Sequence, residues 1–209
     1  MNSFPDQAED SLARLRDVPK APGPARTALL GPEELTAEQA ELHATIAHGP
    51  RAEQTSVPLI DCEGRLLGPF ALMLLAPAVG AAVQQVGAVL RTRTELSPRS
   101  RELAILTVAA HRRSRFEWEA HQGAALEAGL EVAQLQQILD GVIPDDLSEE
   151  DRCVVSTANE LLTQGSLGDA DYESALRILG EKRLAELIWL VGYYSMLAVA
   201  LATLRPESS

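Results

Sequence analysis

The sequence predicts an all-α protein, a helical bundle that forms oligomers. Aromatic residues make up only 4% of the chain whereas alanine and leucine recur throughout, and this balance favours helices over strands. Hydrophobic residues make up 46% and charged residues 23%, the usage of an ordinary folded protein. A length of 209 residues suits one domain, or one domain with an extension.

The beginning of the chain predicts an arm followed by a helix. Residues 1–35 contain five prolines among mixed charges, which are too many interruptions for a long helix. We therefore expect a proline-rich N-terminal arm over this range. Thr36 and Gln39 have the spacing of a capping box, and they predict a helix over about 36–48.

Two long uncharged runs raise the question of a membrane. Residues 66–90 carry no formal charge, but prolines and glycines divide them into two short buried helices, at about 70–75 and 78–93. Residues 187–204 only just reach the length that spans a bilayer. A helix that is apolar on all sides can also be buried between the core and a neighbouring subunit. We therefore expect oligomerisation and no membrane span.

Capping signals place the remaining helices. Ser97 followed by Pro98 opens a helix over about 98–112. Ser114 and Glu117 have the pattern of a capping box, which predicts a helix over about 114–128. A further helix is expected at about 131–140, and Ser148 with Asp151 caps the next one. Asp169 or Asp171 begins another helix, and Glu181 begins the last long helix, which contains the apolar run.

The net charge, the cysteines and the first residues of the chain indicate which binding partners and which cellular compartment to expect. With 18 basic and 30 acidic side chains the formal net charge is −12, so we expect no nucleic-acid partner. Cys62 and Cys153 belong to no CxxC pair or Cys/His cluster, and we expect reduced bystanders, although sequence alone leaves a disulfide open. The first twenty residues lack the basic start and apolar core of a signal peptide, which favours the cytoplasm.

The segment from Ser97 to Gly129 holds the candidate chemistry. Glu117 and His121 are four positions apart, so they share one face of a helix and their side chains can meet. Glu102 on the preceding helix borders apolar positions, and a buried carboxylate needs a partner. A cluster of Glu102, Glu117 and His121 meets that need. Burial raises the pKa of a carboxyl group, and a neighbouring carboxylate raises the pKa of a histidine. Both shifts bring the pKa values toward neutral pH, which suits general acid–base catalysis.

Each member of this cluster also has a plainer interpretation. Glu117 at the third position of a capping box would stabilise the helix end without any chemistry. Glu102 would pair with Arg99 or Arg101 on a solvated face, and His121 would be a hydrogen-bonded core histidine. The spacing alone leaves these alternatives open.

The run LSPRSRELAILTVAAHRRSRFEWEAHQGAALEAGL resembles the core of the carboxymuconolactone decarboxylase-like proteins, whose superfamily also holds the alkyl hydroperoxidase D (AhpD) enzymes. REL, FEWEAH and AxxAGL follow one another in the order typical of that superfamily. The resemblance is strongest over 97–130, extends over 65–205 and leaves out the first thirty-five residues. It implies an AhpD-like all-helical domain over 36–209 that forms a homo-oligomer, a trimer or hexamer.

The hydroperoxidase branch of this superfamily uses a glutamate, cysteines twelve and fifteen positions later, and a histidine nineteen positions after the glutamate. Counted from Glu102, these places hold Ser114, Glu117 and His121. Both cysteines are missing, and a dithiol peroxidase needs one thiolate to attack the peroxide and a second thiol to resolve the sulfenic acid. The resemblance therefore implies the decarboxylase-type branch.

The resemblance implies acid–base lyase chemistry, without cofactor or metal, on a small carboxylated or lactone-like molecule. We expect His121 to donate or shuttle a proton, Glu117 to orient it, and Glu102 to act as a second acid–base group. Arginines would stabilise the enolate and tyrosines would line the pocket, although surface salt bridges and core packing are their plainer roles. The expected substrate-binding residues are Arg115, Arg112, Ser114, Tyr193 and Tyr194.

Three other functions would use or bypass the same residues. A cofactor-free isomerase or hydrolase would act through the same cluster on another substrate. A residual peroxidase would depend on Cys62 or Cys153. A non-catalytic binding or assembly protein would tolerate the loss of His121. The resemblance in fold cannot choose among these functions, because function depends on the site and not on the fold.

Overall fold

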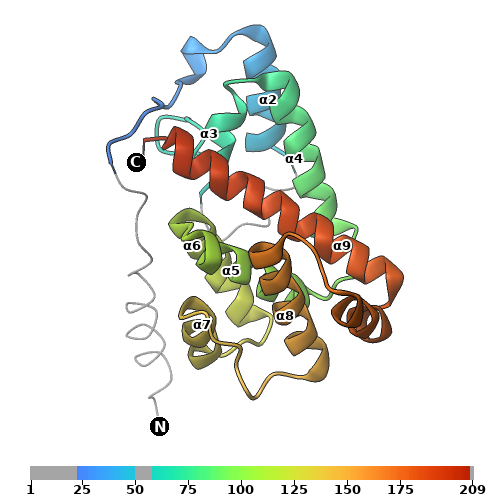
Figure 1. Cartoon of the computed structure of the whole chain (residues 1–209). Coiled ribbons are helices and arrows are strands. Elements are labelled where there is room, and N and C mark those ends of the chain that lie inside the picture. The colour runs from blue at the N-terminus through green and yellow to red at the C-terminus, as the bar shows by residue number, and fades with distance from the viewer. Residues whose placement is uncertain (1–22, 50–57, 208–209) are drawn as a thin grey trace. The chain divides into compact units, whose positions relative to one another are not determined.

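The computed structural model describes residues 23–49 and 58–207. These residues form eight α-helices and one short 3-10 helix, with isolated bridges but no β-strand among them (Figure 1). This confirms the predicted all-α fold class. The elements are η2 (Pro32–Glu34), α2 (Ala37–Ala47), α3 (Pro69–Met73), α4 (Pro77–Thr92), α5 (Pro98–Arg112), α6 (Arg115–Glu127), α7 (Val132–Leu139), α8 (Glu149–Gln164) and α9 (Asp169–Leu204).

The chain divides into two compact units by its internal contacts. The described part of the first unit is Glu95–Ser195, which contains α5 to α8 and most of α9. The described part of the second unit comprises residues 23–49, 58–94 and 196–207, which contain η2, α2, α3, α4 and the end of α9. The predicted active-site residues therefore all belong to the first unit.

α5 is the central helix of the first unit and contacts α6, α7 and α8. Its N-cap Ser97 accepts a hydrogen bond from the backbone N–H of Ser100, and Pro98 occupies the first turn, as predicted. Every residue from Glu102 to Ala109 is buried. Because Glu102 is the charged residue in this buried run, the neighbouring helices have to supply its partner.

α6 follows α5 after a tight reversal in which Arg113 adopts a left-handed backbone, with φ 52°. Ser114 is the N-cap of α6, but its side chain accepts no hydrogen bond from the first turn. The predicted capping box of Ser114 and Glu117 is therefore wrong. The physical reason is that the backbone N–H of Ser114 donates to the carbonyl oxygen of Ala109 at 2.8 Å, so the group that Glu117 would cap is already bonded.

α9 is interrupted at Gly180, whose backbone (φ 76°, ψ 163°) is not helical. The helical residues before and after it correspond to the two helices that the sequence predicts, one from Asp169 and one from Glu181. The positive φ explains the glycine, because a side chain is strained in this region.

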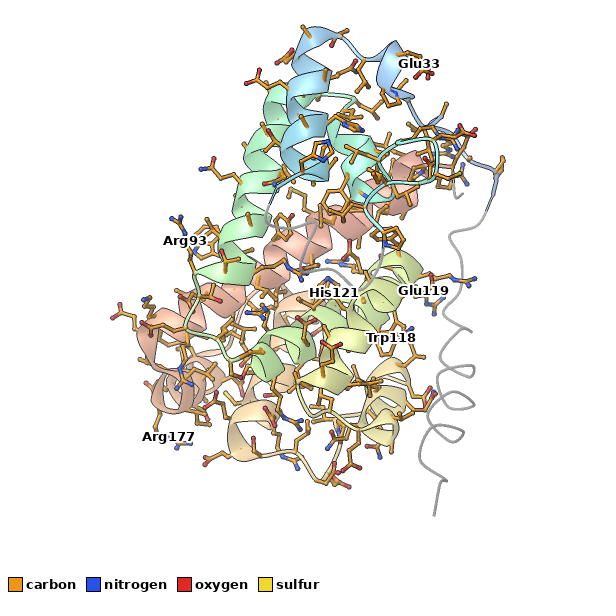
Figure 2. All side chains as sticks on the ribbon, turned by 180° about the vertical axis from the view of Figure 1, so that it is seen from behind. Glu33, Arg93, Trp118, Glu119, His121 and Arg177 are labelled. Atoms are coloured by element: carbon orange, nitrogen blue, oxygen red, sulfur yellow. The ribbon has the colours of Figure 1, made fainter. Side chains whose placement is uncertain are left out.

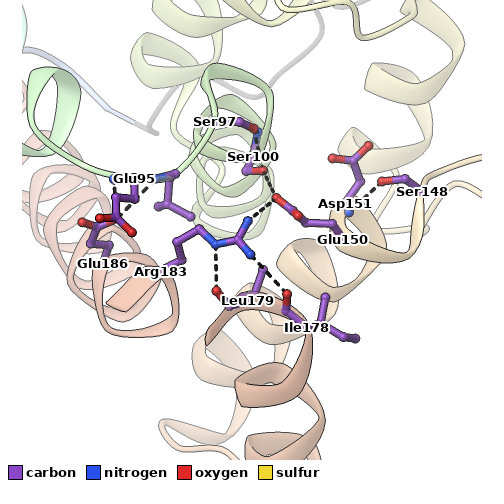
Figure 3. Close-up of polar contacts among 11 residues, drawn as sticks. Glu95, Ser97, Ser100, Ser148, Glu150, Asp151, Ile178, Leu179, Arg183 and Glu186 are labelled. Carbon is purple, nitrogen blue, oxygen red and sulfur yellow. Dashed lines mark hydrogen bonds and ion pairs between the residues drawn. The ribbon is translucent and has the colours of Figure 1, made fainter. Parts of the chain in front are cut away.

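Arg183 holds the break in α9 in place (Figure 3). Its guanidinium donates to the carbonyl oxygens of Ile178 and Leu179, which end the first helical segment. It also donates to Glu150 of α8 at 2.9 Å, and Glu150 accepts a further hydrogen bond from Ser100 of α5. This network connects α5, α8 and α9, and it fixes the direction in which the second segment of α9 leaves the break.

In the second unit, α4 contacts α2 and α3. Thr36 and Gln39 form the predicted capping box of α2. Gly80 of α4 lies so close to α3 that a Cβ atom would overlap the backbone carbonyl oxygen of Met73. Only glycine permits this approach of the two helices.

Most of the predicted N-terminal arm, residues 1–35, lies outside the described residues. Its described part contacts the C-terminal end of the chain within the second unit. The backbone N–H of Arg26 donates to the carbonyl oxygen of Arg205, and the backbone N–H of Glu207 donates to that of Thr27. The division into an arm over 1–35 and a domain over 36–209 stays a prediction.

α9 is the one helix in the described part of the chain that is long and apolar enough to cross a membrane. Buried positions make up 39% of its most apolar 18-residue window. A single helix of this kind is weak support for a membrane span, since core helices of soluble proteins meet the same criterion. The expected lack of a membrane span and the cytoplasmic location stay predictions.

Candidate active site

Two adjacent helices bring Glu102 and His121 together. Glu102 lies in the buried run of α5, and His121 lies on α6, which contacts α5 (Figure 2). The ring atom Nδ1 of His121 is 2.7 Å from Oε2 of Glu102, and the two side chains are only 5% and 4% exposed. With the carboxylate ionised, the Nδ1–H group donates to it. This leaves Nε2 on the other side of the ring as the atom that can exchange a proton.

Glu117 faces that second ring nitrogen. It precedes His121 by one helical turn on α6, and its Oε2 is 3.8 Å from Nε2 of His121. Glu117 is 4% exposed, so both carboxylates of the predicted cluster are buried beside one imidazole. The structure therefore brings together Glu102, Glu117 and His121, as the sequence predicts. The plainer interpretation of Glu102 holds only in part, because Glu102 contacts Arg101 but is buried and does not lie on a solvated face.

Arg101 supplies a positive charge at the edge of this cluster. Its Nε atom is 3.6 Å from Oε1 of Glu102, and its side chain is 18% exposed. Sequence reasoning considered Arg101 only as a surface partner of Glu102 and gave it no role in the site. The contact between Arg101 and Glu102 was expected, but the sequence did not show that it lies at a buried cluster.

One aromatic residue of α9, Tyr194, lies against the imidazole. The rings of His121 and Tyr194 meet edge to face with centroids 5.2 Å apart, and Tyr193 packs against Tyr194 in the same manner. Both tyrosines are buried. The sequence did not indicate which tyrosine lies at the cluster, and the structure shows that Tyr194 contacts His121 directly. A ring held edge to face limits the orientations that the imidazole can take.

The structure places the two expected arginines at the surface. Arg115 forms an ion pair with Glu119 on the same helix at 2.7 Å, and both side chains are about two-fifths exposed, at 41% and 40%. Arg112 is exposed at the end of α5. It adjoins His111, whose pKa is lowered by burial and by the charge of Arg112. Neither the ion pair of Arg115 nor the exposed position of Arg112 supports the expected role of these arginines in substrate binding.

Ser114 is buried at the start of α6, and its backbone carbonyl accepts the N–H of Trp118 at 3.0 Å. It thus lies one helical turn before Trp118 and one residue from the exposed Arg115. Its position fixes where α6 begins and hence where Glu117 and His121 lie. A direct role of Ser114 in substrate binding stays a prediction.

The arrangement suits proton transfer. One ring nitrogen of His121 is held by a carboxylate, and the other faces a second carboxylate at a distance that a small shift or a bridging group can close. Among residues 23–49 and 58–207, no three His, Cys, Asp or Glu side chains are arranged to hold a metal ion. A histidine between two carboxylates is an arrangement that can support general acid–base catalysis.

Residues 77–160 match the sequence model of the carboxymuconolactone decarboxylase family. This match supports the family resemblance that the sequence shows. The matched segment begins at the start of α4 and ends within α8, so it includes Glu102, Glu117 and His121. No curated protein matches the chain.

Proposed function

We propose that this chain is an acid–base lyase that decarboxylates a small carboxylated or lactone-like substrate without a cofactor, because residues 77–160 match the sequence model of the carboxymuconolactone decarboxylase family. The observation that carries the proposal is the buried Glu102–His121–Glu117 cluster inside the matched segment. Three titratable side chains in contact and shielded from water are typical of a site for proton transfer.

The reaction requires one proton to be delivered to carbon. When the bond between the substrate carbon and its carboxylate breaks, carbon dioxide leaves and the bonding electron pair stays on that carbon as an enolate. The Nε2–H group of an imidazolium at His121 then gives its proton to the enolate carbon. Glu102, bonded to Nδ1, stabilises the imidazolium before transfer and the ring orientation throughout. Nε2 regains a proton from solvent by way of Glu117.

Charge balance supports the binding of an anionic substrate at this cluster. Two ionised carboxylates alone would repel a carboxylated molecule. His121 as imidazolium and the guanidinium of Arg101, 3.6 Å from Glu102, offset these two negative charges. We therefore assign to Arg101 the positive field that the sequence led us to expect from Arg112 and Arg115.

Of the expected substrate-binding residues, Tyr194 has the contact that supports such a role. Its ring lies against His121, so a substrate reaching Nε2 would meet it. Tyr193 acts by supporting Tyr194. Neither cysteine occupies α5 or α6, and Ser114 and Glu117 stand where a dithiol peroxidase would have its thiols, which argues against peroxidase activity.

One observation favours a second candidate function. Each side chain of the cluster is no more than 5% exposed, and a polar cluster buried to this degree also connects α5 and α6 without any chemistry. A non-catalytic binding or assembly protein would use the cluster in this way. An isomerase or hydrolase would use it on another substrate and would release no carbon dioxide.

The deciding experiment mixes the purified protein with 4-carboxymuconolactone and records ultraviolet absorbance and carbon dioxide release. His121→Asn removes the proton donor with little change in size, and Glu119→Gln, at an exposed position of the same helix, is the matched control. We expect turnover by the wild type and by the control, and none by the His121 variant. Absence of turnover by folded wild-type protein would reject this substrate, and equal rates in all three proteins would reject the site.

A further inference from the structure

The first turn of α6 has backbone donors that its own helix does not satisfy. The N–H groups of Arg115 and Phe116, the first two residues of α6, have no acceptor within the helix. The side chain of the N-cap Ser114 accepts no hydrogen bond from this turn, whereas Ser97 and Ser148 cap α5 and α8. Because α6 runs for 13 residues, the positive end of its dipole lies at the same place. The start of α6 can therefore donate hydrogen bonds to an anion.

Ser114 itself is a buried residue with an unused hydroxyl. The residue is only 8% exposed, and its hydroxyl has no hydrogen-bond partner among the described residues. The unbonded side-chain atoms of the described residues that are closed to solvent include Nε1 of Trp118 but not Oγ of Ser114, so a ligand can reach this hydroxyl. As the N-cap, Ser114 carries its hydroxyl beside the N–H groups of the first turn. A buried hydroxyl without a partner at this place indicates that a ligand supplies one.

Two arginines immediately before Ser114 form no ion pair with another described residue. Both of them, Arg112 and Arg113, are exposed. Partners are not scarce, because the chain has 30 acidic and 18 basic side chains. Their place at the end of α5 suits the dipole of that helix, and their guanidinium groups are available to an anion as well. The other lysines and arginines in the described part of the first unit each bond to a carboxylate or a carbonyl oxygen: Arg99, Arg101, Arg115, Arg152, Arg177, Lys182 and Arg183.

The start of α6 and the buried cluster lie on one face of the helix. Ser114, Glu117 and His121 are separated by three and four positions, and all three are buried. Along the helix axis Ser114 and His121 are about 10 Å apart, from a rise of about 1.5 Å per residue. Helical side chains lean toward the N-terminus, and Nε2 is the ring nitrogen of His121 on the side of Glu117. A small molecule of this length can contact both Nε2 and the start of α6.

The donors at the start of α6 share one chemical preference. The hydroxyl of Ser114, the N–H groups of Arg115 and Phe116 and the guanidinium of Arg113 are together called the α6 donor group. We propose that the α6 donor group binds a carboxylate that the substrate keeps during the reaction. All its members donate hydrogen bonds and one of them is a cation, which selects an oxyanion.

This assignment rests on the proposed function for the identity of the ligand, and it makes the substrate a dicarboxylate. One carboxylate leaves as carbon dioxide from the carbon that His121 protonates. The other stays at the start of α6 and holds the molecule in place while the bond breaks. Anion binding by the α6 donor group needs no reaction, so it can be measured separately.

The first test measures anion binding without a substrate. Acetate and inorganic phosphate are titrated separately into the isotope-labelled full-length protein, with chloride holding the ionic strength constant, and the backbone amide resonances are followed. We expect acetate to shift the resonances of Arg115 and Phe116 in a saturable manner, because their N–H groups donate to the carboxylate. Saturable shifts with phosphate and none with acetate would overturn the proposal and assign a phosphate ester instead.

Two substitutions remove single members of the α6 donor group. Ser114→Ala removes a hydroxyl without a partner in the described chain, so helicity by circular dichroism should be unchanged. Arg113→Gln removes a charge at an exposed position. Each variant should bind acetate more weakly by about 10-fold or more. Arg177→Gln is the matched control, because it removes the charge of another exposed arginine in the first unit, and it should leave acetate binding unchanged.

The second test uses 4-carboxymuconolactone as the substrate. Arg113→Gln should raise KM by about 10-fold and change kcat little, because the retained carboxylate is bound equally in the ground state and in the transition state. Arg177→Gln should change neither constant. Acetate should compete with the substrate in the wild type and much less in Ser114→Ala.

The two tests separate a failure of this proposal from a failure of the proposed function. Saturable shifts at Arg115 and Phe116 without turnover of the lactone would reject the decarboxylation of this substrate and support the anion site. Turnover by a wild type whose two resonances do not shift would overturn the proposal and leave the decarboxylation intact. Equal acetate affinity in the wild type, Ser114→Ala and Arg113→Gln would also overturn it, because the anion would then bind elsewhere.

Discussion

Nδ1 of His121 lies 2.7 Å from Oε2 of Glu102, although the two residues are 19 positions apart and belong to different helices. Glu102 acts on the ring from the side opposite Glu117, so in the proposed reaction it would not contact the substrate. Its role would be to fix which ring nitrogen carries a hydrogen bond and which one is left for proton transfer. Glu102 is therefore a positioning residue for His121.

Replacing Glu102 by glutamine keeps the size of the side chain and removes its charge. We expect turnover of 4-carboxymuconolactone to fall by about 10² to 10⁴, because the imidazolium loses the carboxylate that stabilises it. Glu119→Gln makes the same change at a position that is 40% exposed, and it should leave the rate unchanged. Initial rates of carbon dioxide release for the two variants decide the matter. Equal rates would show that Glu102 has no part in the reaction.

Arg183 should stabilise the fold by more than an exposed ion pair does, because its guanidinium also donates hydrogen bonds to two backbone carbonyl groups. Replacing it by methionine leaves the carbonyl oxygens of Ile178 and Leu179 and the carboxylate of Glu150 without its hydrogen bonds. We expect the free energy of unfolding in urea to fall by about 1 to 3 kcal/mol.

Arg177→Met is the control for this prediction. Arg177 forms a longer ion pair with Glu149 at 3.5 Å, and its side chain is 66% exposed, so its loss should change stability by less than about 0.5 kcal/mol. If the two variants were destabilised to the same extent, the network at the break in α9 would have no special role.

The helices could be predicted from the sequence because their signals are local. Ser97 and Ser148 cap α5 and α8 with the expected backbone partners, and Thr36 forms the expected capping box. Each of these interactions lies within one helical turn, so four neighbouring residues contain all the information needed. The four-residue spacing of Glu117 and His121 on one helix face is local in the same sense.

The predictions that failed or stayed incomplete depend on how the chain turns between helices and on which side chains become buried, and local sequence patterns do not show either. Ser114 has the sequence of a capping box, yet its N–H donates to Ala109 because the chain reverses tightly between α5 and α6. The sequence assigned Arg115 to the substrate and Arg101 to a surface ion pair, and it held no signal for which of the two lies at the buried cluster. Only the packing of α5 directs one of them toward Glu102, while the other pairs with Glu119 at the surface.

The turn at Asp61 should make stability depend on pH. Burial opposes the charge of Asp61, but hydrogen bonds from the backbone N–H and the side chain of Arg65 and from the backbone N–H of Glu63 outweigh it and lower the pKa of Asp61. A pKa that is lower in the folded state than in the unfolded state stabilises the fold above the unfolded value, near 4, and the stabilisation is lost as the pH falls through the folded value.

Asp61→Asn tests this pH dependence. At pH 7 the variant should be less stable than the wild type, and the difference should shrink as the pH falls below about 4, because the wild-type carboxylate then takes up a proton. Chemical denaturation at several pH values measures the difference. A difference that stays constant down to pH 3 would mean that the charge of Asp61 is irrelevant and that only its hydrogen-bond geometry matters.

The two thiols should react at very different rates, which bears on the peroxidase alternative. Both cysteines are free, with Cys62 exposed and Cys153 buried. Burial raises the pKa of Cys153, outweighing the hydrogen bond with Thr157, so little thiolate forms there near neutral pH.

We expect a disulfide reagent at pH 8 to modify one thiol of the native protein quickly and the second only after denaturation. Cys62→Ser should remove the fast phase and Cys153→Ser should keep it. Two fast thiols, or peroxide consumption that either variant abolishes, would restore the thiol peroxidase as a function for this chain.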